Sequence, residues 1–344
     1  MTRHFSALKL NKALVFIFGL LLLAGCSMPQ DKKITYTEAN QKFLTLCKEE
    51  YKLDVKLFPL KNTLWIYMPI DRPFYIKATE KTTEEKKKPT EKPKIGFLDG
   101  HFEDHSFVIE YDITKIKQYP PKDPGYATGN DEEFAKQYRN LFTAILRAYF
   151  DMEETETSQL VTINQNLEVQ PPEKIKTYTK KEHSPEFFVV VIADIKTGLR
   201  MEYTFNLEDY KHYNNGGLPY EEYSVRQISQ TTGDMEIIGD VKGNSLRTHE
   251  ILWPEFLTKQ ILNRINFKYD KSDFTPSDDT KQEILKSIGE TVTFYDFNDF
   301  DNAVLKDLNT QTTFTAPKET IKKISASAEG TSTGGKFHVI QFFK

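Results

Sequence analysis

Apolar side chains recur along this chain with the 3.6-residue period of helices in some segments and the two-residue period of strands in others. Helical spacing follows residues 37, 131, 253 and 278, and the last of these helices is predicted to stop at Gly289. The helix after residue 131 has the clearest apolar face, made of Phe134, Tyr138, Leu141, Ile145 and Tyr149. The pattern therefore predicts four helices.

Strand periodicity predicts two β-hairpins. The first joins residues 53–57 to 63–68, and the second joins 187–195 to 199–207. The strand at 187–195 is apolar on both faces, which is typical of a central strand, whereas 199–207 alternates and predicts one solvated face. Further single strands are predicted at 106–113, 291–297 and 337–343.

Helices mixed with antiparallel hairpins predict an α+β fold and argue against a doubly wound sheet. A helix precedes a hairpin within residues 37–69 and again within 131–207, and a helix precedes strands after residue 253. This order suggests a repeated α-β-β plan, although the units share no sequence identity. Whether they are true repeats stays open.

Two polar stretches suggest where the chain divides. Residues 79–95 are highly charged and include two prolines, which predicts a mobile loop. A second stretch, rich in proline and glycine, surrounds residue 125 and suggests a boundary. The sequence therefore predicts one α+β domain at 37–125 and another at 128–344, with a further division considered near 245–250.

The N-terminus has the pattern of an export signal. Arg3, Lys9 and Lys12 form a positive segment, and the eleven residues from Ala13 to Leu23 are apolar. Because a membrane-spanning helix needs about 20 apolar residues, this run is too short to span a bilayer. A positive start, a short apolar run and small residues at its end are typical of a cleaved signal peptide.

The residues that follow, Leu23-Ala24-Gly25-Cys26, resemble the lipobox of bacterial lipoproteins. The resemblance implies removal of residues 1–25, acylation of Cys26 with chains such as palmitate, and a lipidated tether at 26–36. It also implies that Ser27 directs the protein to the outer rather than the inner membrane, if the host has two. Exposure to the periplasm or to the exterior stays open.

Charge and cysteine content narrow the class of protein further. The net charge of −4 becomes −7 when Arg3, Lys9 and Lys12 leave with the signal peptide. No basic stripe of the kind that binds nucleic acid is present. With Cys26 acylated, Cys47 has no partner for an internal disulfide. Its helical spacing places it on an apolar face, where a thiol is inert.

Two segments contain residue types that bind metals, but neither has the required spacing. His101-Phe102-Glu103-Asp104-His105 differs from the HExxH order of zinc proteases. Asp296, Asn298, Asp299 and Asp301 lie close together, but Phe300 occupies the third ligand place of a calcium loop and no glycine follows. Both are interpreted as solvated turns, and no metal site is predicted.

Other candidate motifs also fail on their context. Residues 330–336 match the glycine and lysine positions of a phosphate-binding loop, but Phe337 stands where Ser or Thr should bind Mg²⁺. Glu202 and Glu208 could form a carboxylate pair, which is common by chance. Tyr220 and Tyr223 follow a turn-rich segment and could line a pocket, although a connector is the simpler interpretation.

The sequence thus predicts a lipoprotein anchored through Cys26, with no predicted catalytic residue or cofactor. The favoured function is a non-catalytic module that binds or assembles another envelope component, either a protein or a glycan. Two alternatives remain: an envelope hydrolase whose acid and base come from separate loops, and a carrier of an apolar ligand. Partner identity and oligomeric state cannot be read from the pattern.

We expect Cys26→Ala to abolish acylation, because the cysteine sulfur is the acceptor of the first lipid. The variant should then leave the membrane fraction or retain its signal peptide. Cell fractionation and mass spectrometry of the N-terminus measure both outcomes, and Cys47→Ala is the matched control. Normal membrane retention of Cys26→Ala would contradict the lipoprotein assignment.

Overall fold

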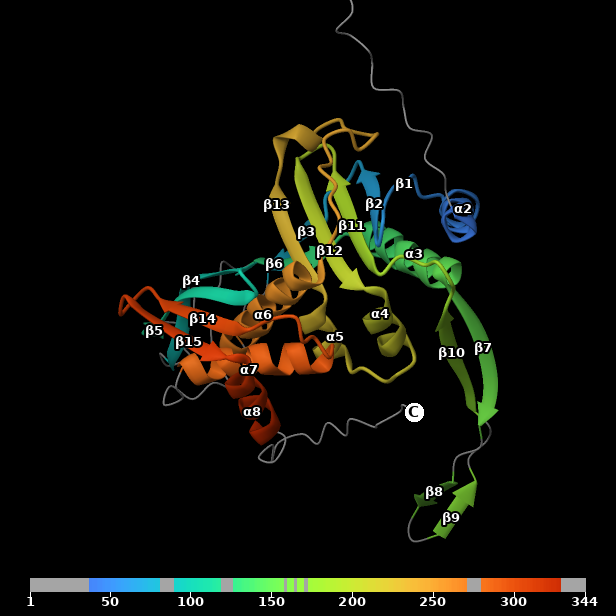
Figure 1. Ribbon diagram of the computed structural model, residues 1–344. Helices are drawn as coiled ribbons and strands as arrows, with labels where there is room; N and C mark the ends of the chain where they lie inside the picture. Colours follow the sequence, from blue (N-terminus) through green and yellow to red (C-terminus); the bar gives the residue numbers. More distant parts are fainter. Residues whose placement is uncertain are drawn as a thin grey trace, which may run out of the picture. The chain divides into compact units, whose positions relative to one another are not determined.

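The computed structural model describes residues 37–80, 90–118, 126–157, 160–163, 166–169, 173–270 and 280–328. Its helices combine with mixed and antiparallel sheets, so the fold is α+β, as the sequence predicted (Figure 1). Residues 38–344 group as one compact unit. The predicted signal peptide, Cys26, the tether and the strand at 337–343 lie outside the described residues.

The first sheet is assembled from two hairpins whose inner strands run parallel. Its strands, in spatial order, are β1 (Lys56–Leu60), β2 (Thr63–Ile70), β11 (Phe187–Asp194), β12 (Leu199–Asn206) and β13 (Ile228–Gly233). β2 and β11 form the parallel pair, with Phe187 opposite Thr63. All eight residues of β11 are buried, because this strand is central and covered on both faces.

Helices cover both faces of the first sheet. On one face lie α2 (Glu38–Thr45), the π-helical turn Leu46–Glu50 and α3 (Glu132–Tyr149), where Tyr149 packs 4.9 Å from Phe188 between ring centroids. On the other face lies α6 (Trp253–Asp270), where Phe256 packs 4.9 Å from Phe187. Adjacent residues of β11 point to opposite faces, so each is buried by a different helix.

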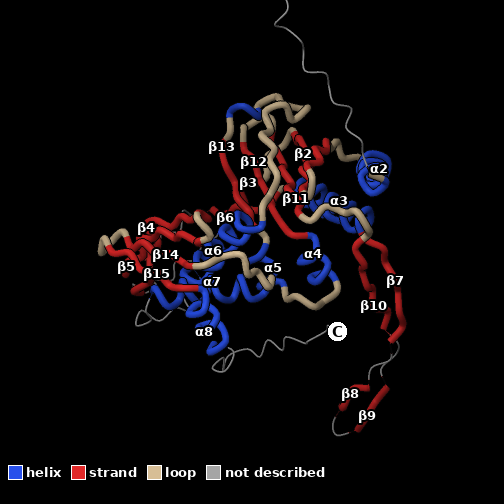
Figure 2. Tube along the Cα trace, in the orientation of Figure 1, coloured by secondary structure: helices blue, strands red, loops and turns tan. Residues whose placement is uncertain are grey.

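The second sheet repeats this arrangement of strands. Its order is β15 (Thr312–Pro317), β14 (Asn302–Asp307), β5 (Ser106–Gln118) and β4 (Thr90–Glu103), and β14 runs parallel to β5. The helices α7 (Thr280–Phe294) and α8 (Lys318–Ala328) pack beside it. Each sheet therefore joins two antiparallel hairpins through one parallel contact. Figure 2 shows the strands of the second sheet beside α7 and α8.

The remaining elements are short. β3 (Tyr75–Glu80) pairs with β6 (Tyr126–Asn130), β7 (Phe150–Thr157) with β10 (Glu173–Lys180), and β8 (Leu160–Ile163) with β9 (Asn166–Val169). Two helices, α4 (Leu207–Asn214) and α5 (Tyr220–Arg226), follow β12. A 3₁₀ turn at Met235–Ile237 follows β13.

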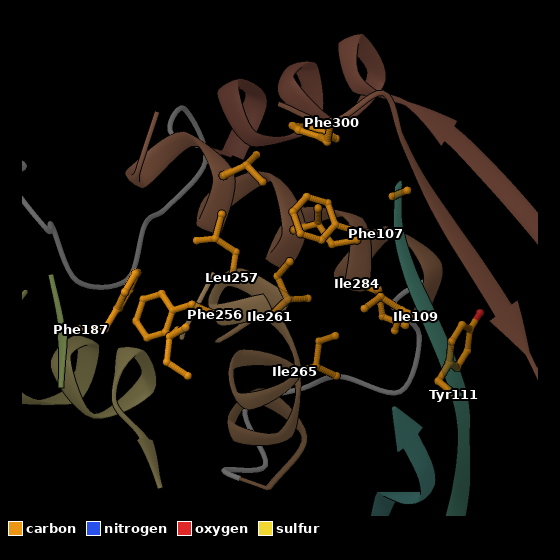
Figure 3. Close-up of a cluster of buried hydrophobic side chains, with 14 of the residues drawn as sticks. Phe107, Ile109, Tyr111, Phe187, Phe256, Leu257, Ile261, Ile265, Ile284 and Phe300 are labelled. Atoms are coloured by element: carbon orange, nitrogen blue, oxygen red, sulfur yellow. The ribbon is translucent and has the colours of Figure 1, made fainter. Parts of the chain in front are cut away.

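One apolar core joins the two sheets through α6. Phe256, Leu257, Ile261 and Ile265 of α6 form a buried stripe between Phe187 of the first sheet and Phe107 of the second (Figure 3). Glycine at position 100 of β4 permits the close approach of this helix. An added Cβ there would lie 2.8 Å from Ile109 Cδ1 and 3.2 Å from Thr258 Cγ2.

Several sequence predictions are confirmed. The hairpin of β11 and β12 turns at the predicted place, and α3 buries the predicted face. The cap of α3 is the Asp131 side chain, which accepts a hydrogen bond from the Phe134 N–H. α6 begins at Trp253 with the predicted buried face. Cys47 is completely buried on the apolar side of the first helical segment.

The predicted boundary between domains at 37–125 and 128–344 does not separate two folding units. β2 pairs with β11 and β5 pairs with β14, so both sheets take strands from each side of it. A division near 245–250 is equally absent from the compact unit. The polar stretches that suggested these boundaries are connections within one fold.

Both ends of the charged loop predicted at 79–95 belong to strands. β3 continues to Glu80 and β4 begins at Thr90. β4 is an edge strand, where charged residues and a proline such as Pro93 are tolerated because one side of the backbone needs no partner. Part of the predicted boundary near residue 125 likewise forms β6.

Two other predictions were wrong because tertiary packing outweighed local preference. α7 continues through Gly289 to Phe294 and replaces the predicted strand at 291–297, since Ile284, Ile288 and Val292 continue one buried helical face. Burial of that face outweighs the roughly 1 kcal/mol that glycine costs in a helix. The solvated face predicted for β12 is also covered, and Glu202 and Thr204 are buried.

We expect Phe256→Ala to lower the free energy of unfolding by about 3–5 kcal/mol, the usual cost of removing a fully buried aromatic ring. Phe256 is completely buried and contacts Phe187, Trp253 and Tyr295. Urea denaturation followed by circular dichroism measures the change. Leu252→Ala, at a position 56% exposed, is the control and should stay within about 0.5 kcal/mol.

Candidate functional site

Of the two cysteines, the structure describes only Cys47. Burial raises the pKa of its thiol to about 12, so the thiolate is scarcely formed at neutral pH. Because the thiolate is the reactive species, Cys47 is unsuited to nucleophilic catalysis. Cys26 and the glycine-rich residues 330–336 lie outside the described residues.

The two candidate metal segments, far apart in sequence, meet in the structure. His105 Nδ1 lies 3.3 Å from Asp299 Oδ1, and the Asp301 N–H donates to the His105 carbonyl oxygen over 2.7 Å. His101 pairs separately with Glu103 at 3.4 Å. Within the described ranges, no three His, Cys, Asp or Glu side chains are placed to hold a metal ion together.

Glu202 and Glu208 do not form a carboxylate pair. Glu202 lies on β12 and accepts hydrogen bonds from Arg200 and Gln230. Glu208 lies in the first turn of α4 and forms ion pairs with Lys180 and Lys211. Each is occupied by basic or amide partners of its own, so the structure gives no support to acid–base chemistry by this pair.

A cluster of buried and half-buried charges ties helices α4 to α7 together, and sequence periodicity gave no sign of it. Arg226 of α5 donates from Nη1 to Asp209 of α4 over 3.1 Å and from Nε to Glu222 over 2.8 Å. Arg264 of α6 binds Glu222 through both terminal nitrogens, at 2.7 and 3.2 Å. Tyr295, just after α7, donates its hydroxyl to Asp209.

Burial sets the electrostatics of this cluster. Asp209 and Arg226 are 2% and 4% exposed, and the Arg226 guanidinium also stacks on the Phe294 ring. Desolvation raises the pKa of Asp209 despite the neighbouring Arg226 and the Tyr295 hydroxyl. Burial by itself would also raise the pKa of Glu222. The hydrogen bonds and charges of Arg264 and Arg226 outweigh burial, so the pKa of Glu222 is lowered.

The cluster is better suited to structure than to catalysis. Its charged groups are matched one against another, and each of the four helices supplies or adjoins a member. Perturbed pKa values can mark active sites, but structural ion-pair networks produce them as well. Because Asp209 and Arg226 are buried and Glu222 and Arg264 are paired, the geometry supports the interpretation as a structural ion-pair network.

A different cluster reaches the surface and consists of tyrosines. We name as the tyrosine surface Tyr138, Tyr203, Tyr213, Tyr220 and Tyr223. Tyr213 and Tyr223 stack with ring centroids 4.5 Å apart, and Tyr138 meets Tyr203 edge-on at 5.4 Å. The members come from α3, β12, α4 and α5, so one surface draws on four elements.

Phe142 and Tyr210 lie behind these rings and join them into one aromatic group. Phe142 contacts Tyr138 at 4.6 Å and Tyr210 at 6.1 Å, and Tyr210 in turn contacts Tyr223 at 6.1 Å. The packing holds the outer rings in fixed positions. Rigid, amphipathic side chains of this kind lose little conformational entropy when a partner binds.

Exposure increases across the tyrosine surface. Tyr220 is 66% exposed, Tyr138, Tyr203 and Tyr213 are partly exposed, and Tyr223 is buried. Burial, reinforced by the neighbouring tyrosines, raises the pKa of Tyr138. The Tyr223 hydroxyl has no hydrogen-bond partner within the described part of the chain. The surface therefore offers the rings and hydroxyl groups of its four exposed or partly exposed members to a partner.

The sequence indicated only part of this surface. Tyr220 and Tyr223 were recognised beside a turn-rich loop, and in the structure both rings contact Tyr213. Tyr138 was assigned to a buried helical stripe, and Tyr203 to an alternating strand. No local signal could show that these segments meet, because the contact joins residues 65 positions apart.

We expect Arg226→Met to destabilise the fold by about 3–5 kcal/mol, because removing one partner leaves the other charge buried. Adding Asp209→Asn should restore part of this loss. Urea denaturation of both variants measures the difference. Arg247→Met, at a side chain 89% exposed, is the control. If Arg226→Met costs no more than Arg247→Met, the cluster does not hold the helices together.

Comparison with known proteins adds no family to this description. No protein-family model matches the chain, and neither do the curated proteins nor the solved structures that were searched. Across the described residues, every helix is too short or too polar to cross a bilayer. The candidate site therefore rests on its own geometry.

Proposed function

We propose that this chain is a lipoprotein, anchored through acylated Cys26, whose α+β unit is a non-catalytic module that binds another envelope protein. The lipobox-like residues 23–26 support the anchor. The tyrosine surface supports binding, and it is the single observation that carries this part of the proposal. Ser27 favours the outer membrane over the inner membrane in a host with two.

The chemistry of the tyrosine surface favours a protein partner. Tyrosine is enriched in the cores of protein interfaces, where charged residues are depleted, and it is frequent among the residues that dominate binding energy. Stacked Tyr213 and Tyr223 form a firm centre, and the exposed Tyr220 extends from it. A glycan could also contact tyrosine rings, and the experiment below separates the two classes.

The ion pairs of the acids in α4 and α5 support a binding role over hydrolysis. A hydrolase needs an acid and a base that can reach a substrate. Asp209 and Glu222 are instead bound to Arg226 and Arg264, and Glu208 is paired with two lysines. These three carboxylates thus have structural partners.

The binding role is tested by placing a photoreactive amino acid at position 220 of the full-length protein in intact cells. Because the Tyr220 side chain is largely exposed, its replacement should not disturb the fold. We expect one recurrent protein adduct after illumination. The same probe at Phe314, which is 42% exposed on β15, is the matched control and should not give that adduct.

A second variant shows whether the tyrosine rings supply the affinity. Tyr213→Ser should reduce the position-220 adduct by about tenfold or more, since loss of a tyrosine that dominates an interface costs about 2 kcal/mol or more. An adduct that contains glycan and no protein would replace the protein partner by a glycan. No adduct, or one unaffected by Tyr213→Ser, would contradict the proposed binding surface.

A further inference from the structure

The edge of the first sheet that β13 forms is open. β13 is the outermost strand on its side of this sheet, and among the described residues it pairs with β12 alone (Figure 1). Five of its six residues, from Ser229 to Gly233, are exposed. An edge strand presents a row of backbone N–H and C=O groups that can pair with another strand. β13 therefore has the geometry of a strand-binding site.

The devices that normally prevent strand addition are missing from β13. Its six residues include no charged side chain and no proline, and its register with β12 runs without a bulge. β1, at the opposite edge of the same sheet, contains Lys56 and Pro59. Charged side chains, prolines and bulges are the usual protection of an exposed edge. The first sheet is thus protected in this way at β1 and not at β13.

The open edge continues the tyrosine surface. Tyr203 of β12 lies directly opposite Ser229 of β13, so the two side chains share one face of the sheet. On that face Tyr203 contacts Tyr138 edge-on, with ring centroids 5.4 Å apart. A strand added to β13 would therefore lie beside the surface that is proposed to bind a partner.

The side chains that β13 places on this face are small. Ser229, Thr231 and Gly233 alternate along it. Neighbouring strands are separated by about 4.8 Å, so an added strand would lie about 9.6 Å from β12. Only a large side chain of the added strand would pass over Ser229 and reach the Tyr203 ring. The edge therefore fits a segment with bulky apolar or aromatic residues at alternate positions.

A second copy of β13 would fill this space poorly. Antiparallel pairing of two β13 strands would place the small residues of one copy beside those of the other. The space next to each Tyr203 would then stay unfilled, which forfeits the close packing of a stable interface. A partner segment with larger side chains buries more apolar surface at the same place.

We propose that the partner of the tyrosine surface binds through an extended segment that adds a sixth strand to the first sheet, beside β13. This inference rests on the proposed function and adds the form in which the partner binds. Main-chain hydrogen bonds to β13 supply affinity, and alternate apolar or aromatic side chains of the segment contact Tyr203. Because β13 has no charged residue to pair with, the segment is uncharged as well.

The first test places a photoreactive amino acid at Ser229 or Thr231 of the full-length protein in intact cells. Both positions should give an adduct with the same protein as position 220. Because they lie two residues apart on one face, they should label sites about two residues apart in one peptide of the partner. Thr313 on β15, which is also an exposed and uncharged edge strand, is the matched control position and should not label this peptide.

The second test removes a main-chain donor by Thr231→Pro or Thr232→Pro, with the photoreactive amino acid at position 220. The N–H groups of adjacent strand residues point to opposite edges, so one of these prolines affects only the open edge. That variant should keep the urea midpoint of the wild type and reduce the position-220 adduct several-fold. Valine at the same position retains the N–H and should keep the adduct. The labelling pattern decides the question if both proline variants are destabilised.

The outcomes separate this inference from the proposed function. A position-220 adduct without one at 229 or 231, or one that the outward proline leaves unchanged, would overturn strand addition and leave the binding surface intact. An adduct between two copies of this chain would assign the edge to self-association and also overturn it. Absence of the position-220 adduct would contradict the proposed function itself and this inference with it.

Discussion

The fold depends on the burial of one helix between two sheets. The apolar stripe of α6 packs against β11 on one side and against β5 on the other, and it is the element that joins the two halves into one core. Without α6, each sheet would expose the apolar face that this helix covers. The close approach at Gly100 shows how tightly the helix and the second sheet are fitted.

The ion pairs beneath α4 to α7 add specificity to this apolar contact. Buried charge is costly. Arg264 and Arg226 outweigh the desolvation of Glu222, whereas the desolvation of Asp209 exceeds the effect of Arg226 and Tyr295. Hydrophobic burial alone would allow neighbouring helices to slide. A guanidinium held by two carboxylates and an aromatic ring permits one arrangement, which also fixes α4 and α5 under the tyrosine surface.

The surface proposed for contact with a partner protein is held by the packing behind it. Phe142 and Tyr210 back the rings of the tyrosine surface, which draws its members from α3, β12, α4 and α5. An ordered surface loses little entropy on binding, which favours affinity without a large contact area.

The sequence by itself determined the local features of this protein. Apolar periodicity was sufficient to place α3, α6 and the hairpin of β11 and β12, and the chemistry of residues 23–26 was sufficient to predict an anchor. Only the tertiary structure decided that β2 joins β11 and β5 joins β14, that α7 passes through Gly289, and that Tyr138 meets Tyr203. Those outcomes depend on burial between segments far apart in the chain, and periodicity reports only that a residue is buried, not which distant surface buries it.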